Sequence, residues 1–204
     1  LYLAQPFQQP VPDNAGGPNY AADRNGIALY DFPGHQVLTH FIRHMPLRVS
    51  SHRGLGAYAN VFAIESFMDE LAAAAKADPA EFRLKHLSDP RAVDVIKAVL
   101  KASDWQTRPG PNPESAQGNV AKGRGISYVR YNNAITYVAT VAEVEVNRST
   151  GQITVTRVFV AHDCGQIVNP DGVTNQIEGG VIQTVSRTLM EEVKWTGNQV
   201  TSVD

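Results

Sequence analysis

Hydrophobic residues recur at helical spacing between residues 61 and 100. In the first part of this stretch they fall on one face of a helix, which four consecutive alanines extend. Asp78-Pro79 and Asp89-Pro90 each offer an N-cap acceptor followed by proline at the first helical position, so each predicts a further helix. The third helix should end before Trp105. The positions that define the first helical face are Val61, Ile64, Phe67, Met68 and Leu71.

Residues 125–161 alternate instead between apolar and polar positions, as strands with one buried face do. The alternation predicts three strands, over residues 125–131, 137–146 and 152–161, with residues 147–151 as a hairpin loop between the last two. After Asn169-Pro170 the period changes again. A helix over about 172–188, rich in small residues, is predicted by the four-residue spacing of Val173, Ile177, Val181 and Val185.

These elements predict one α/β domain in which helices pack on a mixed β-sheet. Residues 1–50 are rich in turn formers and should be extended or irregular, with one short strand at 37–42. A helical segment (51–105), a loop (106–122) and a β-rich segment (123–204) follow. The chain starts at Leu1 without methionine or a targeting segment, and its last residues resemble an interrupted strand. We therefore expect residues 1–204 to be one partial domain, a fragment of a longer protein.

Composition narrows the classes of partner. The formal charge is −2, from 18 Lys+Arg and 20 Asp+Glu, so nucleic acid and anionic membranes are not expected ligands. No apolar run approaches the roughly 20 residues of a membrane-spanning helix. The one cysteine, Cys164, excludes a disulfide framework and any all-cysteine metal site within these residues. Any iron–sulfur cluster would have to lie elsewhere, and the cellular compartment is left open.

Two histidine-containing motifs invite a catalytic or metal-binding interpretation, and a structural one fits each better. In His162-Asp163-Cys164-Gly165, histidine and cysteine on one strand face would lie about 6–7 Å apart, beyond hydrogen-bonding reach. We interpret this motif as a strand end entering a turn, with Asp163 accepting from backbone amides. In His40-Phe41-Ile42-Arg43-His44, a zinc protease would carry glutamate where Phe41 stands. We predict no metal-ligating set in this chain.

Two glycine-containing stretches suit a bound ligand. Arg53-Gly54-Leu55-Gly56 follows an apparent strand (47–51) and precedes a helix, so its backbone amides can approach an anion closely. A tight turn without a ligand fits equally, because Ala59 replaces the third glycine of a dinucleotide-binding motif. Gln176-Ile177-Glu178-Gly179-Gly180 lies on the small-residue helix, where Gln176 can donate and accept hydrogen bonds. A helix packed tightly on another backbone explains that stretch as well.

In their order along the chain, these motifs resemble those of the molybdopterin-binding subunits of the xanthine dehydrogenase and aldehyde oxidase family. Within that family they are most similar to the isoquinoline 1-oxidoreductase and nicotinate dehydrogenase type. Each stretch is weak alone, and the ordered set, which covers about residues 28–195, is specific. The matching stretches are PLRVSSHRGLG (46–56), FAIESFMDELA (62–72), DPAEFR (78–83), DCGQIVNP (163–170) and QIEGG (176–180).

The resemblance implies a reaction, cofactors and partners. Such enzymes hydroxylate an electron-poor carbon of an N-heterocycle or an aldehyde, with oxygen taken from water. The implied cofactors are molybdopterin with molybdenum, including forms extended by a cytosine dinucleotide, and a [2Fe–2S] cluster on a small iron–sulfur partner subunit. The protein positions the molybdenum cofactor, which carries the difficult chemical step. The motifs do not specify the substrate or the electron acceptor.

Carried over position by position, the resemblance also implies site residues. The turn at 51–53 matches a loop whose backbone lies beside molybdenum and pterin, and Gln176 matches a glutamine that hydrogen-bonds the pterin. Leu55 matches a substrate-channel position that often holds an aromatic ring, so leucine removes a stacking platform. We expect the turn at 51–56 and the helix at 172–188 to fold towards each other as one wall of a pocket. The implied cofactor-binding residues are Ser51, His52, Arg53, Gly54, Gln176 and Gly179.

One feature of the family is absent. Its catalytic base is a glutamate in a Gly-x-Gly-Glu motif, and no such motif occurs in these 204 residues. We therefore assign no catalytic residue, and we expect the base downstream of Asp204. Glu65 does not replace it, because Glu65 sits among core helix residues. Alone, the chain is expected to be inactive and to bind molybdopterin weakly. The alternatives are a stand-alone cofactor-binding or assembly module and a structural domain with a degenerate site.

Overall fold

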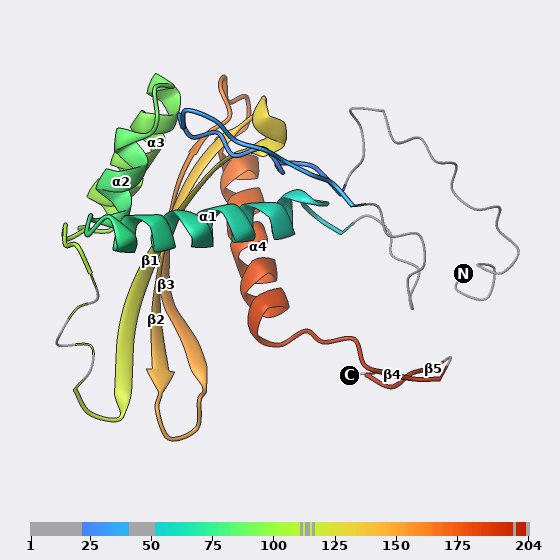
Figure 1. The fold of residues 1–204 in the computed structure, drawn as a ribbon. Helices are drawn as coiled ribbons and strands as arrows, with labels where there is room; N and C mark the ends of the chain where they lie inside the picture. The colour runs from blue at the N-terminus through green and yellow to red at the C-terminus, as the bar shows by residue number, and fades with distance from the viewer. Residues whose placement is uncertain are drawn as a thin grey trace, which may run out of the picture.

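The computed structural model describes residues 22–40, 52–110, 112, 115, 117–197 and 199–202. Three helices precede a three-stranded sheet, and a long fourth helix and a small hairpin follow it (Figure 1). The predicted class, helices packed on a sheet, is confirmed. The helices are α1 (Ala57–Ala74), α2 (Pro79–Lys85), α3 (Pro90–Ala102) and α4 (Pro170–Leu189). The strands are β1 (Val120–Arg130), β2 (Tyr137–Asn147), β3 (Ile153–Asp163), β4 (Trp195–Thr196) and β5 (Gln199–Val200).

The two Asp-Pro pairs start α2 and α3, as predicted. Asp78 accepts hydrogen bonds from two backbone amides of the first turn of α2, at 2.8 and 3.1 Å. Asp89 caps α3 through one amide at 3.0 Å. Asp78 is only 2% exposed, and its carboxylate also accepts from the indole N–H of Trp105 at 3.1 Å. The same buried carboxylate therefore starts α2 and holds the residue at which the helical segment ends.

The buried face of α1 differs in one position from the predicted face. Met68 is 2% exposed and lies in the core, and Ile64 and Leu71 pack against it. Phe67 was predicted on the same face, and this is wrong, because its side chain is 57% exposed. At about 100° per residue, the buried stripe is centred near Met68 and extends towards Glu65, which is buried. Phe67 is left at the exposed edge of the stripe.

The strands β1, β2 and β3 pair in that order, and both pairings are antiparallel. β1 begins at Val120, five residues before the predicted start at 125, so the predicted loop at 106–122 was too long. Its first five residues include two charged ones, Lys122 and Arg124, and Lys122 pairs across the sheet with Glu145 at 3.0 Å. Cross-strand ion pairs stabilise a strand whose residues look like a loop in sequence. At the other end, the chain leaves the sheet in a short turn, η3 (Tyr131–Asn133).

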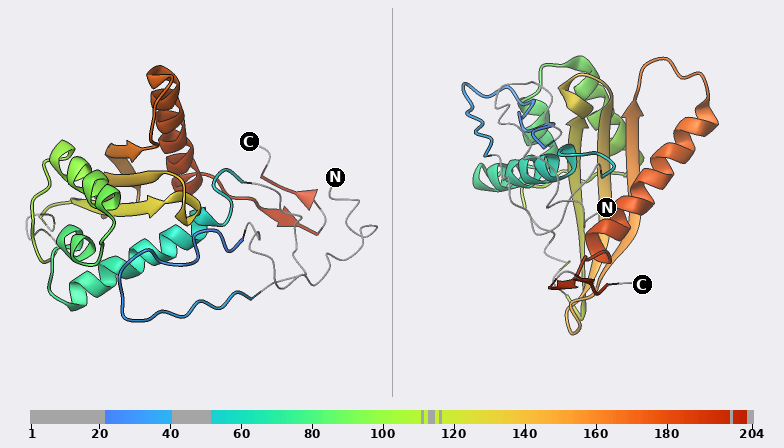
Figure 2. Two further views of the ribbon diagram at one scale, coloured as in Figure 1. Left: turned by 90° about the horizontal axis from the view of Figure 1, so that it is seen from above. Right: turned by 90° about the vertical axis from the view of Figure 1, so that its right-hand side faces the viewer.

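One face of the sheet packs against the first three helices and forms the core. α3 lies on this face, and α4 stands on the other side of the sheet (Figure 2). The strands contribute alternate residues to the core, as expected for a sheet with one buried face. The core residues of the sheet are Ile126, Tyr128, Tyr137, Ala139 and Val141, and those of α3 are Ala92, Val95, Ile96 and Val99.

Residues 22–32 lie against α1 and η3. The Asn25 side chain is 6% exposed and donates to the carbonyl of Arg130 at 2.8 Å, and Tyr30 enters the core. The strand predicted at 37–42 is wrong for residues 37–40, which are exposed and carry no strand. Within the described ranges, no strand pairs with residues 37–40. Residues 41–42 lie outside the described residues, as does the strand predicted at 47–51.

The last described residues form the hairpin of β4 and β5, in which Trp195 pairs with Val200. A strand near this position was predicted from the sequence. None of the helices in the described part of the chain combines the length and the apolar character needed to cross a membrane.

Candidate functional site

The outer face of the sheet and α4 enclose a groove of about 1190 Å³. Alternate residues of β2 and β3 form its floor, and they are the neighbours of the core-facing residues along each strand. None of the described residues of α4 is buried, so its apolar stripe borders the groove and not a core. The helix lines the groove with Val173, Ile177, Val181 and Val185, the positions whose spacing predicted α4.

A tight turn at residues 52–56 leads into α1. The Leu55 amide donates to the carbonyl of His52 at 2.9 Å, and the His52 side chain is exposed. Gly54 has a φ of +96°, a conformation that side-chain-bearing residues rarely adopt, so this position requires glycine. Leu55 has a φ of 54°, which stores strain of about 1 kcal/mol. Ser51, predicted to begin the cofactor-side loop, lies outside the described residues.

The side chain of Arg53 joins this turn to α4. Its Nη2 atom donates to the main-chain oxygen of Gln176 at 3.2 Å and to Oε1 of the same residue at 3.1 Å. Nη1 lies 3.5 Å from Oε1 of Gln183, two helical turns further on. Gly180 lies between the two glutamines, and a Cβ built there would be 3.8 Å from Nη2. The guanidinium therefore lies against the bare surface of the helix.

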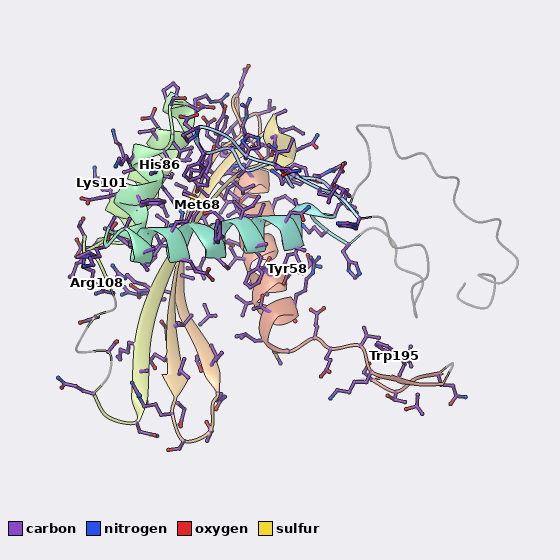
Figure 3. All side chains as sticks on the ribbon, viewed as in Figure 1. Tyr58, Met68, His86, Lys101, Arg108 and Trp195 are labelled. Carbon is purple, nitrogen blue, oxygen red and sulfur yellow. The ribbon has the colours of Figure 1, made fainter. Side chains whose placement is uncertain are left out.

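The helix returns a hydrogen bond to the turn, because Arg187 Nη1 donates to the carbonyl of Arg53 at 2.8 Å. The Arg187 guanidinium also lies 5.5 Å from the centre of the Tyr58 ring, and the Tyr58 hydroxyl is 3.3 Å from Oγ1 of Thr188. Figure 3 shows Tyr58 on the first turns of α1, next to α4. We call Arg53, Gln176 and Arg187 the clasp. It holds the turn and the small-residue helix side by side, as the sequence led us to expect.

Two side chains hold the link between β3 and α4. Asp163 accepts from the Gly165 amide at 2.9 Å, and its two oxygens accept from the guanidinium of Arg91 at 2.7 Å each. These hydrogen bonds, that from Arg91 first, lower the pKa of Asp163 to about 2. Asn169 caps α4 by accepting from the Gly172 amide at 2.9 Å. The interpretation of this motif as a strand end entering a turn is confirmed.

His162 and Cys164 border the groove. His162 occupies a position on β3 at which its alternate neighbours, Val158 and Val160, are apolar and also line the groove. Its Nδ1 atom is buried and has no hydrogen-bond partner among the described residues. An unsatisfied buried nitrogen is costly, so His162 is a polar position that the fold does not fully satisfy. His162 was not predicted as a site residue, although a lone polar residue in a run of alternating valines marks it.

The structure brings together only part of the predicted site. Arg53 and Gln176 both line the groove and contact each other. Leu55 and Gly179 do not line it, and a Cβ built at Gly179 would meet nothing within 4 Å. Arg53 and Gln176 therefore form a polar rim on a groove whose walls are mostly, though not entirely, apolar.

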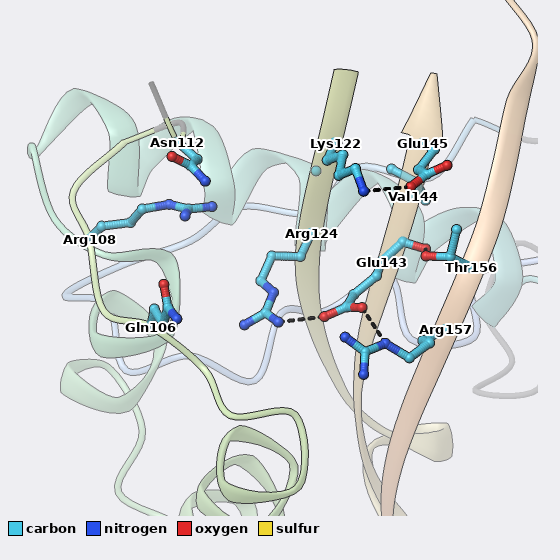
Figure 4. A pocket seen from close by; sticks show the side chains of 11 residues that line it. Gln106, Arg108, Asn112, Lys122, Arg124, Glu143, Val144, Glu145, Thr156 and Arg157 are labelled. Atoms are coloured by element: carbon cyan, nitrogen blue, oxygen red, sulfur yellow. Dashed lines mark hydrogen bonds and ion pairs between the residues drawn. The ribbon is translucent and has the colours of Figure 1, made fainter. Parts of the chain in front are cut away.

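A second hollow, of about 520 Å³, lies on the core-facing side of the sheet, where β1 starts and β2 ends (Figure 4). Glu143 accepts from Arg124 and from Arg157, the latter at 2.6 Å, and Lys122 pairs with Glu145. Burial opposes the ionisation of Glu143, yet the bonds from both arginines outweigh it and lower its pKa. Because these charges are paired with one another, we interpret this hollow as the solvated end of the sheet.

The groups around the groove suit a large planar ligand with a hydrogen-bonding edge. Apolar walls can hold a flat ring, and the Gln176 amide and the Arg53 guanidinium can form hydrogen bonds with its polar edges. Over the described ranges, no group of three or more His, Cys, Asp or Glu side chains is placed to hold a metal ion.

Comparisons with known proteins identify the family of the chain. Residues 50–203 match the family model of the molybdopterin cofactor-binding domain. The chain is 45% identical over 186 residues to a subunit of the nicotinate dehydrogenase of Pseudomonas putida, covering 88% of this chain and 16% of that protein. It is 38% identical over 189 residues to the beta subunit of the isoquinoline 1-oxidoreductase of Brevundimonas diminuta, covering 92% of this chain and 22% of that protein. The chain thus spans about a fifth of the length of these curated relatives.

Proposed function

Since the chain belongs to the molybdopterin cofactor-binding domains of the xanthine dehydrogenase and aldehyde oxidase family, we propose that it forms one wall of the cofactor pocket in a molybdenum hydroxylase large subunit. The observation that supports this most directly is the clasp, which joins two segments with family motifs at the rim of the groove. The proposal assigns Leu55 to the substrate channel. It assigns to the cofactor side Ser51, His52, Arg53, Gly54, Gln176 and Gly179.

The residues of this chain have distinct tasks in this proposal. The Gln176 amide hydrogen-bonds a polar edge of the pterin. The Arg53 guanidinium and the backbone amides of the turn at 52–56 add positive potential beside anionic groups. Gly180 leaves room on the helix for the Arg53 guanidinium, and Gly179 keeps the neighbouring surface free of a side chain. The valines of β2 and β3 keep water from the opposite side of the groove.

The reaction we propose for the whole protein is the hydroxylation of a carbon in an N-heterocycle or an aldehyde. When bound, the molybdenum–pterin group supplies the two-electron oxidation, with oxygen from water. Two relatives are named for nicotinate and isoquinoline, which supports an N-heterocyclic substrate. Their names also call them subunits, which supports a separate small partner subunit carrying [2Fe–2S] clusters. We further propose the cytosine dinucleotide form of the pterin, and a catalytic base supplied by another part of the large subunit.

The test uses the full-length large subunit, purified with its partners. Gln176→Ala is expected to lower the molybdenum content per subunit several-fold, because hydrogen bonds worth about 1 kcal/mol each are lost. Circular dichroism should stay unchanged. Gln152→Ala, on the exposed loop between β2 and β3, is the matched control and should retain full molybdenum content. A normal molybdenum content in Gln176→Ala would contradict the proposed site.

A further inference from the structure

We propose that Arg53 is a positioning residue, which holds the Gln176 amide in one orientation so that Gln176 meets the cofactor only as a hydrogen-bond donor. The inference rests on the proposed function and adds the direction of the hydrogen bond between Gln176 and the cofactor. The cofactor atom that faces Gln176 must then be an acceptor, which means a carbonyl oxygen, a ring nitrogen without hydrogen or a phosphate oxygen.

The orientation follows from the chemistry of the two side chains. A guanidinium has only donors, whereas a glutamine amide has an oxygen on one side and an NH₂ group on the other. The end of Gln176 that lies 3.1 Å from Arg53 must therefore be the oxygen, because the flipped amide would turn donors against donors. The NH₂ group of Gln176 makes no hydrogen bond to the residues that the structure describes, and Gln176 lines the groove. Its two N–H donors are left for a ligand.

Arg53 is itself held from several sides, which a positioning residue requires. Its guanidinium donates to the main-chain oxygen of Gln176 at 3.2 Å and lies 3.5 Å from Gln183. Its own carbonyl accepts from Arg187 at 2.8 Å. Gly180 leaves space for the guanidinium, since a Cβ there would lie 3.9 Å from Cζ. The Arg53 side chain therefore has little freedom to release the Gln176 oxygen.

A purely structural clasp is the alternative, in which Arg53 and Gln176 only tie the turn to the helix. Gln176→Glu separates the two ideas in the full-length enzyme. A carboxylate accepts from Arg53 at least as well as the amide does, so the clasp and the thermal stability are kept. The carboxylate has no N–H donor, however, and it repels an acceptor atom of the cofactor. We expect pterin release from the loaded enzyme in mild urea, followed by pterin fluorescence, to become about tenfold faster.

Gln152→Glu makes the same chemical change on the exposed loop between β2 and β3, and it should leave the release rate unchanged. A purely structural clasp predicts an unchanged release rate for Gln176→Glu as well. That result would overturn the proposal.

Substitutions of Arg53 test whether it acts through Gln176. Arg53→Met frees the amide to flip, and release should become about threefold to tenfold faster. Arg53→Lys should restore part of the slow release, because lysine still donates to the Gln176 oxygen. Combined with Gln176→Ala, Arg53→Met should add no further acceleration, because the residue that it positions is gone. If Arg53 acts instead through its bonds to the Gln176 main chain and to Gln183, which Gln176→Ala leaves in place, the two effects should add.

The outcomes distinguish a failure of the cofactor site from a failure of the positioning role. Slow release in Gln176→Ala, equal to that of the unmodified enzyme, would contradict the proposed cofactor site itself. Fast release in Gln176→Ala together with slow release in Arg53→Met, or with additive effects in the double variant, would contradict only the positioning role of Arg53.

Discussion

Replacing Glu65 by glutamine removes one charge from a buried polar cluster beneath α1. Glu65 is 6% exposed, and its Oε1 atom accepts from the Tyr30 hydroxyl at 2.8 Å. Its Oε2 atom accepts from Arg83 Nε at 2.9 Å and from the Tyr128 amide at 2.8 Å. Burial raises the pKa of Glu65, and Arg83 together with the other donors acts in the opposite direction. The carboxylate thus joins α1, α2, β1 and the N-terminal segment.

The size of the effect follows from what the substitution leaves behind. A glutamine has the same shape and can turn its oxygen to the two donors at the Oε2 position and its NH₂ group to the Tyr30 hydroxyl, which can accept, so what is lost is the negative charge beside Arg83. Arg83 is 0% exposed, and among the described residues Asp69, which is 47% exposed, would be its one remaining charged partner, at 2.7 Å. Removing one partner of a buried ion pair costs about 3–5 kcal/mol. This is a large share of a total free energy of unfolding of about 5–15 kcal/mol.

Urea denaturation of the chain, followed by circular dichroism, measures the loss. Asp69→Asn is the matched control, and it should cost about 1 kcal/mol because its carboxylate is half exposed. The double variant Glu65→Gln/Arg83→Met should lose less than the sum of the single losses, because it leaves no unpaired buried charge. A loss below about 1 kcal/mol in Glu65→Gln would refute this account of the cluster.

Three further predictions concern the caps and turns. Asp78→Ala should lower the free energy of unfolding by about 3 kcal/mol, because it removes a helix cap and leaves a partly buried indole N–H unpaired. Asp89→Ala should cost about 1 kcal/mol, and urea denaturation compares the two variants. The pKa of Asp163 is lowered to about 2, so its stabilising contribution is present above about pH 4 and is lost as the pH falls through 2. The melting temperatures of the unmodified chain and Asp163→Asn should therefore differ at pH 5 and converge near pH 2. Gly54→Ala should cost about 1–2 kcal/mol because of its positive φ, and an unchanged denaturation midpoint would contradict that interpretation.

The sequence predicted the helices well, because their signals are local. The Asp-Pro caps act within a few residues of the starts of α2 and α3. The four-residue spacing in α4 is likewise a pattern within one short segment of the chain. The start of β1 was missed because it pairs with residues of β2 that are far away in sequence, such as Glu145 opposite Lys122. The exposure of Phe67 was missed because Glu65 takes a buried position that hydrophobicity alone assigns to an apolar residue.

The family resemblance drawn from the motifs is confirmed by the match over residues 50–203. The motifs also pointed to Arg53 and Gln176, which the structure places in contact. They did not point to Arg187 or His162. Arg187 donates to a carbonyl 134 residues earlier in the chain. The missing hydrogen-bond partner of His162 Nδ1 depends on which neighbours bury that atom. Contacts of this kind depend on the assembled fold and leave no periodic or capping pattern in the sequence.

The position of the clasp depends on α1, because the hydrogen bonds of the clasp are exposed and individually weak. The turn that carries Arg53 runs directly into α1, an 18-residue helix. Glu65, two turns into that helix, is fixed by donors from three other elements. A helix is stiff over this distance, so fixing Glu65 also fixes the start of α1 and the direction in which the turn approaches α4. A buried ion pair such as Glu65–Arg83 often adds little net stability. Here it also fixes the position of an exposed site.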